Sequence, residues 1–182
     1  MLKIFFIFII LILSGCSNLQ NSIKWQDSKT IMSSYKELKI GDIIIKKKLL
    51  LPYSWFGHVA IVVSDNTIGE YPKFNVGYCE TGILDWLYND RKIIILRYKY
   101  FDEKFKEEFL NNLNRYKGKI YKLGFNKYDE NYFYCSKYIW LLYIKTAKKL
   151  NYKLDFDKYK KQIYIYPYNF LSSEEFEIIQ SF

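Results

Sequence analysis

FGHVAIVV, residues 56–63, contains His58, the only histidine of a 182-residue chain. The run of small and β-branched residues predicts a buried strand. The turn residues SDNT at 64–67 then predict a hairpin that returns along IGEY, residues 68–71. A single histidine at the start of such a strand is either a structural residue bonded to the backbone or one member of a catalytic pair.

The other sequence patterns predict an α+β fold, in which a small antiparallel sheet packs against helices. Apolar β-branched runs predict further strands at 43–45, 92–98, 162–167 and 176–182. Helical spacing of large apolar residues predicts a short helix at 83–89 and longer helices at 101–117 and 135–150.

Composition and charge exclude some classes of protein. Hydrophobic residues make up 50% of the chain and aromatic residues 20%, which excludes a disordered protein. The formal net charge is +9, but the basic residues are scattered and no nucleic-acid-binding motif is present. We therefore expect no nucleic-acid partner, although a basic surface could attract anionic lipid or cell-wall polymer.

The N-terminus has the pattern of a lipoprotein signal peptide. One early lysine precedes a ten-residue apolar run from Ile4 to Leu13, which is too short to span a bilayer. LSGC, residues 13–16, resembles a bacterial lipobox, in which the signal is cut before a cysteine that is then acylated. We therefore expect a signal peptide at 1–15, a lipidated Cys16 followed by a tether at 16–37, and a folded domain at 38–182. The alternative is an ordinary secretory signal with an incidental cysteine.

Cys135 stands where an aromatic segment leads into the predicted helix at 135–150. A thiol at a helix N-terminus faces unpaired N–H groups and the positive end of the helix dipole, and both stabilise a thiolate. The dipole contributes under about 1 kcal/mol, so a working nucleophile also needs a nearby imidazolium, and only His58 can supply one. Alternatively, Cys135 is a buried core residue or forms a disulfide with Cys79.

Five short motifs, in this order, resemble those of the circularly permuted, NlpC-type papain-like proteins, especially the YiiX-like lipoproteins. They are KIGDIII (39–45), GHVAIVV (57–63), GEYP (69–72), YCSKYIW (134–140) and YPYNFLSS (166–173). In the permuted branch the histidine strand precedes the cysteine helix, as it does here. The resemblance implies a papain-like fold with the catalytic cysteine at a helix N-terminus. It also implies a third polar residue, commonly Glu, on the strand that follows the histidine.

Carried over to this chain, the resemblance makes Cys135 the nucleophile, His58 the base and Glu70 the third catalytic residue. The hairpin supports Glu70, because it brings the IGEY segment alongside the histidine strand, where a carboxylate could accept the ring N–H. Glu80 is the competing candidate. No cofactor and no metal site are expected, because the histidine has no cluster of ligating residues near it in sequence.

The three catalytic residues predict acyl transfer through a thioester. We expect a monomeric, membrane-anchored hydrolase of the bacterial cell envelope, a cysteine peptidase or amidase that cleaves amide bonds in cell-wall peptides or small amides. The alternatives are a lipid acyltransferase or deacylase with the same triad, and a non-catalytic envelope-binding lipoprotein. Lys122 and Lys137 stand where relatives often have acidic residues, so no substrate preference is carried over.

Overall fold

The computed structural model describes residues 23–50, 54–88, 91–155 and 161–180. The predicted signal peptide at 1–15 and the predicted lipidation site Cys16 lie outside the described residues. None of the described helices is both long and apolar enough to cross a membrane.

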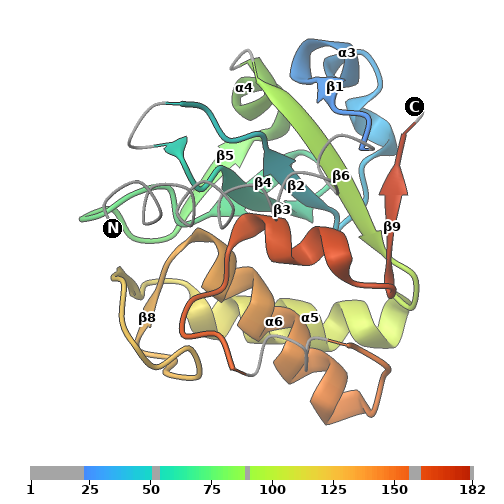
Figure 1. Ribbon diagram of the computed structural model, residues 1–182. Helices are drawn as coiled ribbons and strands as arrows, with labels where there is room; N and C mark the ends of the chain where they lie inside the picture. The colour runs from blue at the N-terminus through green and yellow to red at the C-terminus, as the bar shows by residue number, and fades with distance from the viewer. Residues whose placement is uncertain (1–22, 51–53, 89–90, 156–160, 181–182) are drawn as a thin grey trace, which may run out of the picture.

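An antiparallel sheet with helices on both faces forms the domain, which confirms the predicted α+β class (Figure 1). Within the described residues, the sheet has seven strands. Six of them follow the order β1-β6-β2-β3-β4-β5, and the seventh, β9, also pairs with β6. Their bounds are β1 (Gln26–Asp27), β2 (Ile43–Lys46), β3 (His58–Ser64), β4 (Thr67–Glu70), β5 (Cys79–Gly82), β6 (Lys92–Tyr98) and β9 (Phe176–Ile179).

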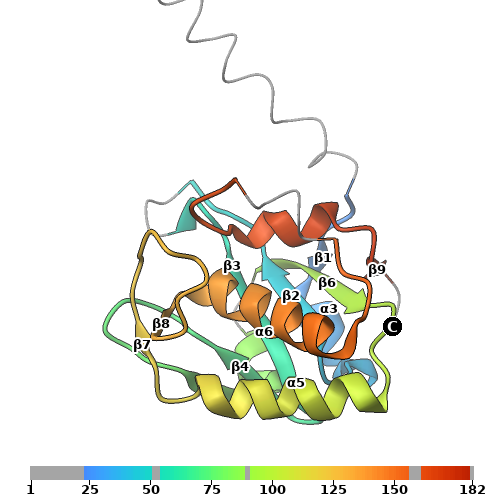
Figure 2. The same ribbon diagram turned by 90° about the horizontal axis from the view of Figure 1, so that it is seen from below.

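Two layers of helices explain why the central strands are apolar on both faces. The long helices α5 (Glu103–Tyr116) and α6 (Cys135–Leu150) cover one face of the sheet, while the short helices α3 (Ser28–Met32) and α4 (Ile83–Tyr88) cover the other (Figures 1 and 2). Residues alternate between the two cores along each strand, so that Val59 and Ile61 pack with α5 and α6, whereas Ala60 packs with α3 and α4.

The remaining elements are short. A two-stranded parallel sheet joins β7 (Ile120–Tyr121) to β8 (Tyr132–Phe133), immediately before α6. Within the described residues, the 3-10 helix η2 (Tyr35–Glu37) follows α3, and the 3-10 helix η5 (Pro167–Ser172) precedes β9. β8 leads directly into α6, and the segment that precedes η5 is hydrogen-bonded to residues at the start of that helix.

The structure differs from the sequence predictions in two segments. Residues 26–37, which we predicted to be part of a tether, pack on the domain: β1 pairs with β6, and Ile31 is buried against α4. Residues 162–167 do not form the predicted strand and instead run as an irregular segment into η5. Ile163 is exposed and Ile165 is buried, so the alternation there reflects a segment lying on the surface of the domain rather than a strand.

Candidate active site

His58 begins β3, at the point where the chain enters the sheet from a tight bend. Gly57, directly before it, has φ +71°, and a Cβ there would lie 2.8 Å from the backbone oxygen of Lys46. Only glycine adopts this conformation at little cost in such a confined place. The bend therefore sets the imidazole at the end of the strand, with about a fifth of the side chain exposed to solvent.

Glu70, at the end of β4, lies beside the histidine as the predicted hairpin requires. Its Oε2 is 2.5 Å from Nε2 of His58, and the carboxylate is largely buried. The competing candidate Glu80 belongs to β5 and has other partners: it pairs with Lys117 at 2.5 Å and accepts a hydrogen bond from Tyr78. The structure thus brings Glu70, and not Glu80, to the imidazole.

Cys135 is the first residue of α6, and its thiol lines the same cavity as the His58 imidazole, which lowers the pKa of the thiol. Because Glu70 occupies Nε2, the other ring nitrogen of His58, Nδ1, is the one left for the thiol. Tyr134 precedes the helix in an extended conformation and provides no side-chain cap for its first N–H groups. Cys79 and Cys135 are both free thiols, so they do not form the disulfide considered as an alternative.

The three groups reinforce one another's charges. Burial by itself lowers the pKa of His58, but hydrogen bonds to Cys135 and Glu70 outweigh it and raise that pKa to about 9. Burial opposes ionisation of Cys135 and Glu70 as well, yet the hydrogen bond and positive charge of His58 hold the pKa of each below its ordinary value. The site therefore favours a thiolate, an imidazolium and a carboxylate in a row.

The segment around Ile165 is fastened to the start of α6 by two hydrogen bonds. Its backbone N–H donates to the Tyr134 hydroxyl at 2.9 Å, and its carbonyl accepts from the Ser136 hydroxyl at 2.7 Å. These bonds fix Tyr164 and Tyr166 beside the thiol. Sequence reasoning missed this clamp, because its two halves lie about thirty residues apart and carry no recognisable motif.

A cavity of about 380 Å³ opens at the thiol. Its wall is mostly aromatic and apolar, and Phe56 stacks on Tyr166 at its rim with ring centroids 5.6 Å apart. Apart from His58 and Cys135, no lining residue carries an ionisable acid or base other than tyrosine. The lining residues are Phe56, Gly57, His58, Pro72, Tyr121, Leu123, Tyr134, Cys135, Ser136, Tyr164, Ile165, Tyr166 and Pro167.

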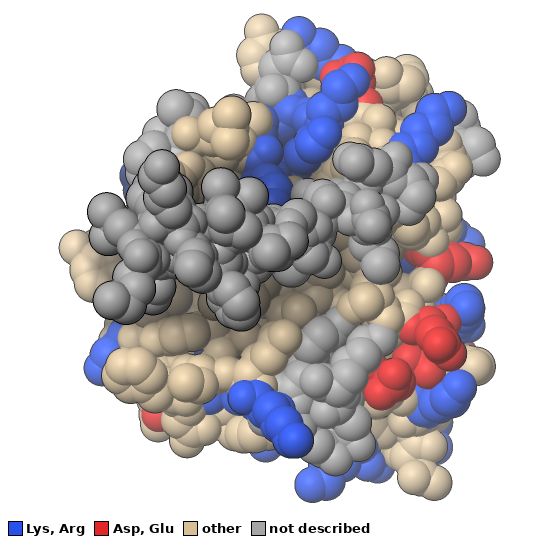
Figure 3. All heavy atoms as spheres, in the orientation of Figure 1, with Lys and Arg blue, Asp and Glu red and all other residues tan. Residues whose placement is uncertain are grey.

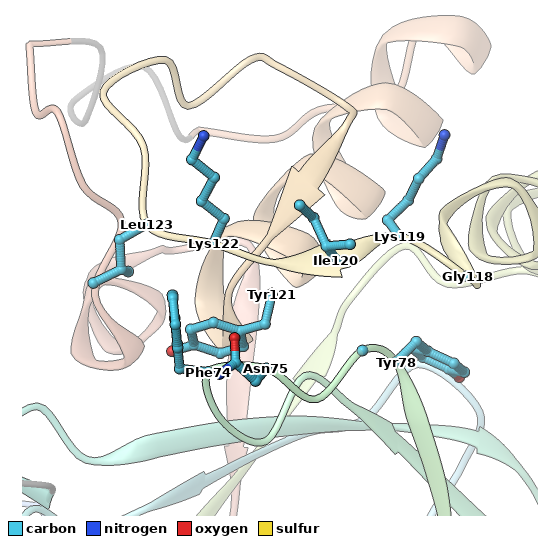
Figure 4. Close-up of a pocket in the computed structure, with 10 residues that line it drawn as sticks. Phe74, Asn75, Tyr78, Gly118, Lys119, Ile120, Tyr121, Lys122 and Leu123 are labelled. Carbon is cyan, nitrogen blue, oxygen red and sulfur yellow. The ribbon is translucent and has the colours of Figure 1, made fainter.

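A second, larger groove of about 730 Å³ adjoins this cavity and shares Tyr121 and Leu123 with it. It runs between β7 and the loop that follows β4, with Phe74 and Tyr121 lying close together between the two, while Lys119 and Lys122 project away from them (Figure 4). The groove does not contain the thiol. A molecule bound at Cys135 can nevertheless extend past Tyr121 into it.

The two lysines at unusual positions have different surroundings. Lys137 is fully buried; its ammonium donates to the Tyr132 carbonyl at 2.9 Å and lies 3.6 Å from the centre of the Tyr132 ring, so it joins α6 to β8. Lys122 lines the groove.

On the face shown in Figure 3, basic side chains are scattered and do not gather into a single patch.

Comparisons with known proteins identify a family and a similar fold. A model of the family described as "Permuted papain-like amidase enzyme, YaeF/YiiX, C92 family" matches residues 28–179. The chain is also similar in fold to a solved structure titled as the metalloprotein yiiX from Escherichia coli O157:H7, with 16% sequence identity, a TM-score of 0.56, and coverage of 79% of this chain and 97% of that one. A search of curated proteins found no match. Across the described part of this chain, no three His, Cys, Asp or Glu side chains gather as a metal site would require.

Proposed function

The chain belongs to the permuted papain-like amidase family, and from this premise we propose that it is a cysteine hydrolase in which Cys135, His58 and Glu70 cleave an amide bond. The observation that carries the proposal is the 2.5 Å contact between His58 and the Glu70 carboxylate, with the Cys135 thiol lining the same cavity as the imidazole. Burying three ionisable groups costs desolvation free energy. Such groups with shifted pKa values, beside an open cavity, are typical of catalytic sites.

The proposed reaction begins with a thiolate at Cys135 and a proton on His58. The thiolate attacks the amide carbonyl and forms a C–S bond, and the carbonyl electrons move to the oxygen. His58 then gives its proton to the leaving nitrogen as the C–N bond breaks, which leaves a thioester and a free amine. Water, deprotonated by the neutral imidazole, attacks the thioester, so that a carboxylic acid leaves and the thiolate–imidazolium pair is restored.

Two further groups support these steps. Glu70 accepts the Nε2–H of His58, which holds the ring orientation and stabilises the imidazolium. The N–H groups at the start of α6, which no N-cap side chain occupies, are directed toward the region where the oxyanion develops. The helix dipole adds to this stabilisation.

The chemical character of the cavity wall indicates which class of substrate it could accept. Aromatic side chains without charged neighbours suit an uncharged group next to the scissile carbonyl, and the adjoining groove provides room for a longer chain. A peptide or small amide of the cell envelope fits this description, with an uncharged residue at the scissile bond. The same apolar lining favours the second candidate, an enzyme that transfers or removes a lipid acyl chain with the same three residues.

The proposed location is the bacterial cell envelope, with the protein held to the membrane through a lipidated Cys16. The support for this is the LSGC sequence directly after the apolar run. Mass spectrometry of the mature N-terminus tests it: the expected mass has diacylglycerol on Cys16 and no residue before it. A mature chain that begins elsewhere, with an unmodified Cys16, would exclude the anchor.

Activity is tested with a set of chromogenic peptide amides, small amides and acyl thioesters or esters, using the full chain and Cys135→Ala as the matched control. We expect release of amine from at least one amide and no release by the Cys135→Ala protein. Turnover of acyl esters without any amide cleavage would favour the lipid-acyl alternative. Labelling of Cys135 by a thiol-directed acylating probe without turnover of either substrate class would contradict both enzymatic proposals.

A further inference from the structure

Lys46 is a buried lysine next to the catalytic row, and the reaction described above does not use it. It is the last residue of β2, it is 8% exposed, and it is the cross-strand partner of His58. Partners in neighbouring antiparallel strands place their side chains on the same face of the sheet. A lysine this buried needs compensating interactions, because removing an ammonium from water is costly.

Trp86, on α4, provides one of these interactions. The Lys46 ammonium lies 3.6 Å from the centre of the Trp86 ring, within the range of a cation–π contact. Trp86 is itself 3% exposed, so this contact is shielded from solvent. Short range and burial both strengthen the attraction, and the indole holds the ammonium at a defined position.

Trp86 also reaches the catalytic row directly, because its side chain hydrogen-bonds to Glu70. The indole N–H is the only hydrogen-bonding group of a tryptophan side chain, so Trp86 donates and the carboxylate accepts. The Glu70 carboxylate therefore receives a bond from His58 on β3 and another from Trp86 on α4, and it faces the positive charge of Lys46 on β2.

We propose that Lys46 and Trp86 are positioning residues for the amidase reaction, which hold the Glu70 carboxylate, in its charged form, against the imidazole of His58. The Trp86 bond fixes the carboxylate's orientation, and the Lys46 charge opposes its protonation. The catalytic meaning rests on the proposed function, but the physical effect on Glu70 does not.

The direction of the effect follows from the charges that meet here. Burial raises the pKa of Glu70, while His58, Trp86 and Lys46 all lower it. The Lys46 ammonium experiences burial first, then attraction to Glu70 and repulsion from Arg91, and its pKa falls to about 8. At neutral pH Lys46 is therefore mostly charged, and removing either Lys46 or Trp86 must raise the pKa of Glu70.

The test measures the titration of the Glu70 carboxyl carbon by ¹³C NMR in the full chain, assigned by the signal that Glu70→Gln removes. The variants are Lys46→Met, which keeps the volume, Lys46→Arg, which keeps the charge, and Trp86→Phe, which removes the donor. Lys92→Met is the control, since Lys92 is a half-exposed surface lysine that pairs with Asp27 at 2.6 Å.

We expect the Glu70 midpoint to rise by about half a pH unit or more in Lys46→Met and in Trp86→Phe, as loss of a neighbouring charge or donor does. Lys46→Arg should stay nearer to the parent protein, and Lys92→Met should match it. An unchanged Glu70 midpoint in the folded variants would overturn the proposal. If Lys46→Met does not fold, the comparison of Trp86→Phe with the parent protein decides.

The acid limb of amide hydrolysis should move in the same direction in the same variants. Because the Glu70 titration is recorded without any substrate, it is independent of whether an amide is the true substrate. A shifted Glu70 midpoint without any hydrolysis would count against the proposed function alone. Hydrolysis with an unshifted midpoint would count against the positioning role alone.

Discussion

Replacing His58 by alanine tests whether the imidazole activates the thiol. In the parent protein, the positive charge of His58 holds the pKa of Cys135 below its ordinary value, and His58 keeps its proton up to a pH of about 9. At pH values above the lowered pKa of Cys135 and below about 9, the thiol is therefore mostly ionised while His58 is still protonated. In His58→Ala the thiol loses this support, while the burial that opposes ionisation remains.

The size of the effect follows from the thiolate fraction. A thiol with a pKa of about 8.5 is only about 0.3% ionised at pH 6, so the parent protein has an advantage of at most about 300-fold there. A thiolate of lower pKa is also a weaker nucleophile, by about threefold for each pKa unit. We therefore expect His58→Ala to slow alkylation of Cys135 at pH 6 by more than tenfold.

The assay is time-resolved labelling with iodoacetamide, read by peptide mass spectrometry. Cys79 lies in the same chain, is free, and belongs to β5, so its labelling rate serves as an internal standard. A circular dichroism spectrum shows whether the variant is folded. If the ratio of Cys135 to Cys79 labelling at pH 6 is the same in both folded proteins, the thiolate–imidazolium pair does not form and the proposed nucleophile is wrong.

Three other outcomes are expected. His58, as the chain's only histidine, should give a single ring-proton NMR titration with a midpoint near pH 9. Hydrolysis should decline above that pH as the imidazolium loses its proton. A midpoint near 6.5 would contradict the interaction of His58 with Cys135 and Glu70. Glu70→Gln should lower that midpoint and the turnover, whereas Glu80→Gln should alter neither; equal effects of the two would remove the distinction between them. Gly57→Ala should lower the free energy of unfolding by about 1–2 kcal/mol or more, because φ is +71° and the added Cβ would approach a backbone oxygen; unchanged thermal unfolding would argue against the bend.

The parts of the site that sequence could predict are those specified by local patterns. The hairpin brings Glu70 to His58 because a short turn returns β4 antiparallel alongside β3. Cys135 lies at a helix start because the apolar spacing of α6 begins there. The contributions of Lys46, Trp86 and Ile165 depend on contacts between distant segments, and nothing in their local sequence marks them. A lysine at the end of a strand normally suggests a solvent-exposed edge, and only the tertiary structure shows that this one is buried.

Two predicted segments differ because tertiary packing outweighed the local pattern. The mostly polar sequence at 26–37 resembles a linker, yet buried Ile31, with Met32 and Tyr35 packed around it, docks α3 against α4. At 162–167 the alternating aromatic and aliphatic residues resemble a strand. However, the backbone N–H and carbonyl of Ile165 are bonded to side chains at the start of α6, so they are not paired with a neighbouring strand.

The order of the catalytic groups along the chain also bears on how the protein is made. His58 and Glu70 lie in the first half of the chain, and Cys135 lies more than sixty residues after them. While the chain is being synthesised, the segment that forms the histidine hairpin is therefore made before Cys135. In the unfolded chain the thiol has an ordinary pKa of about 8.5 and is mostly protonated at neutral pH. In the proposed mechanism, Cys135 therefore becomes reactive only when folding closes this long loop and brings His58 to the thiol.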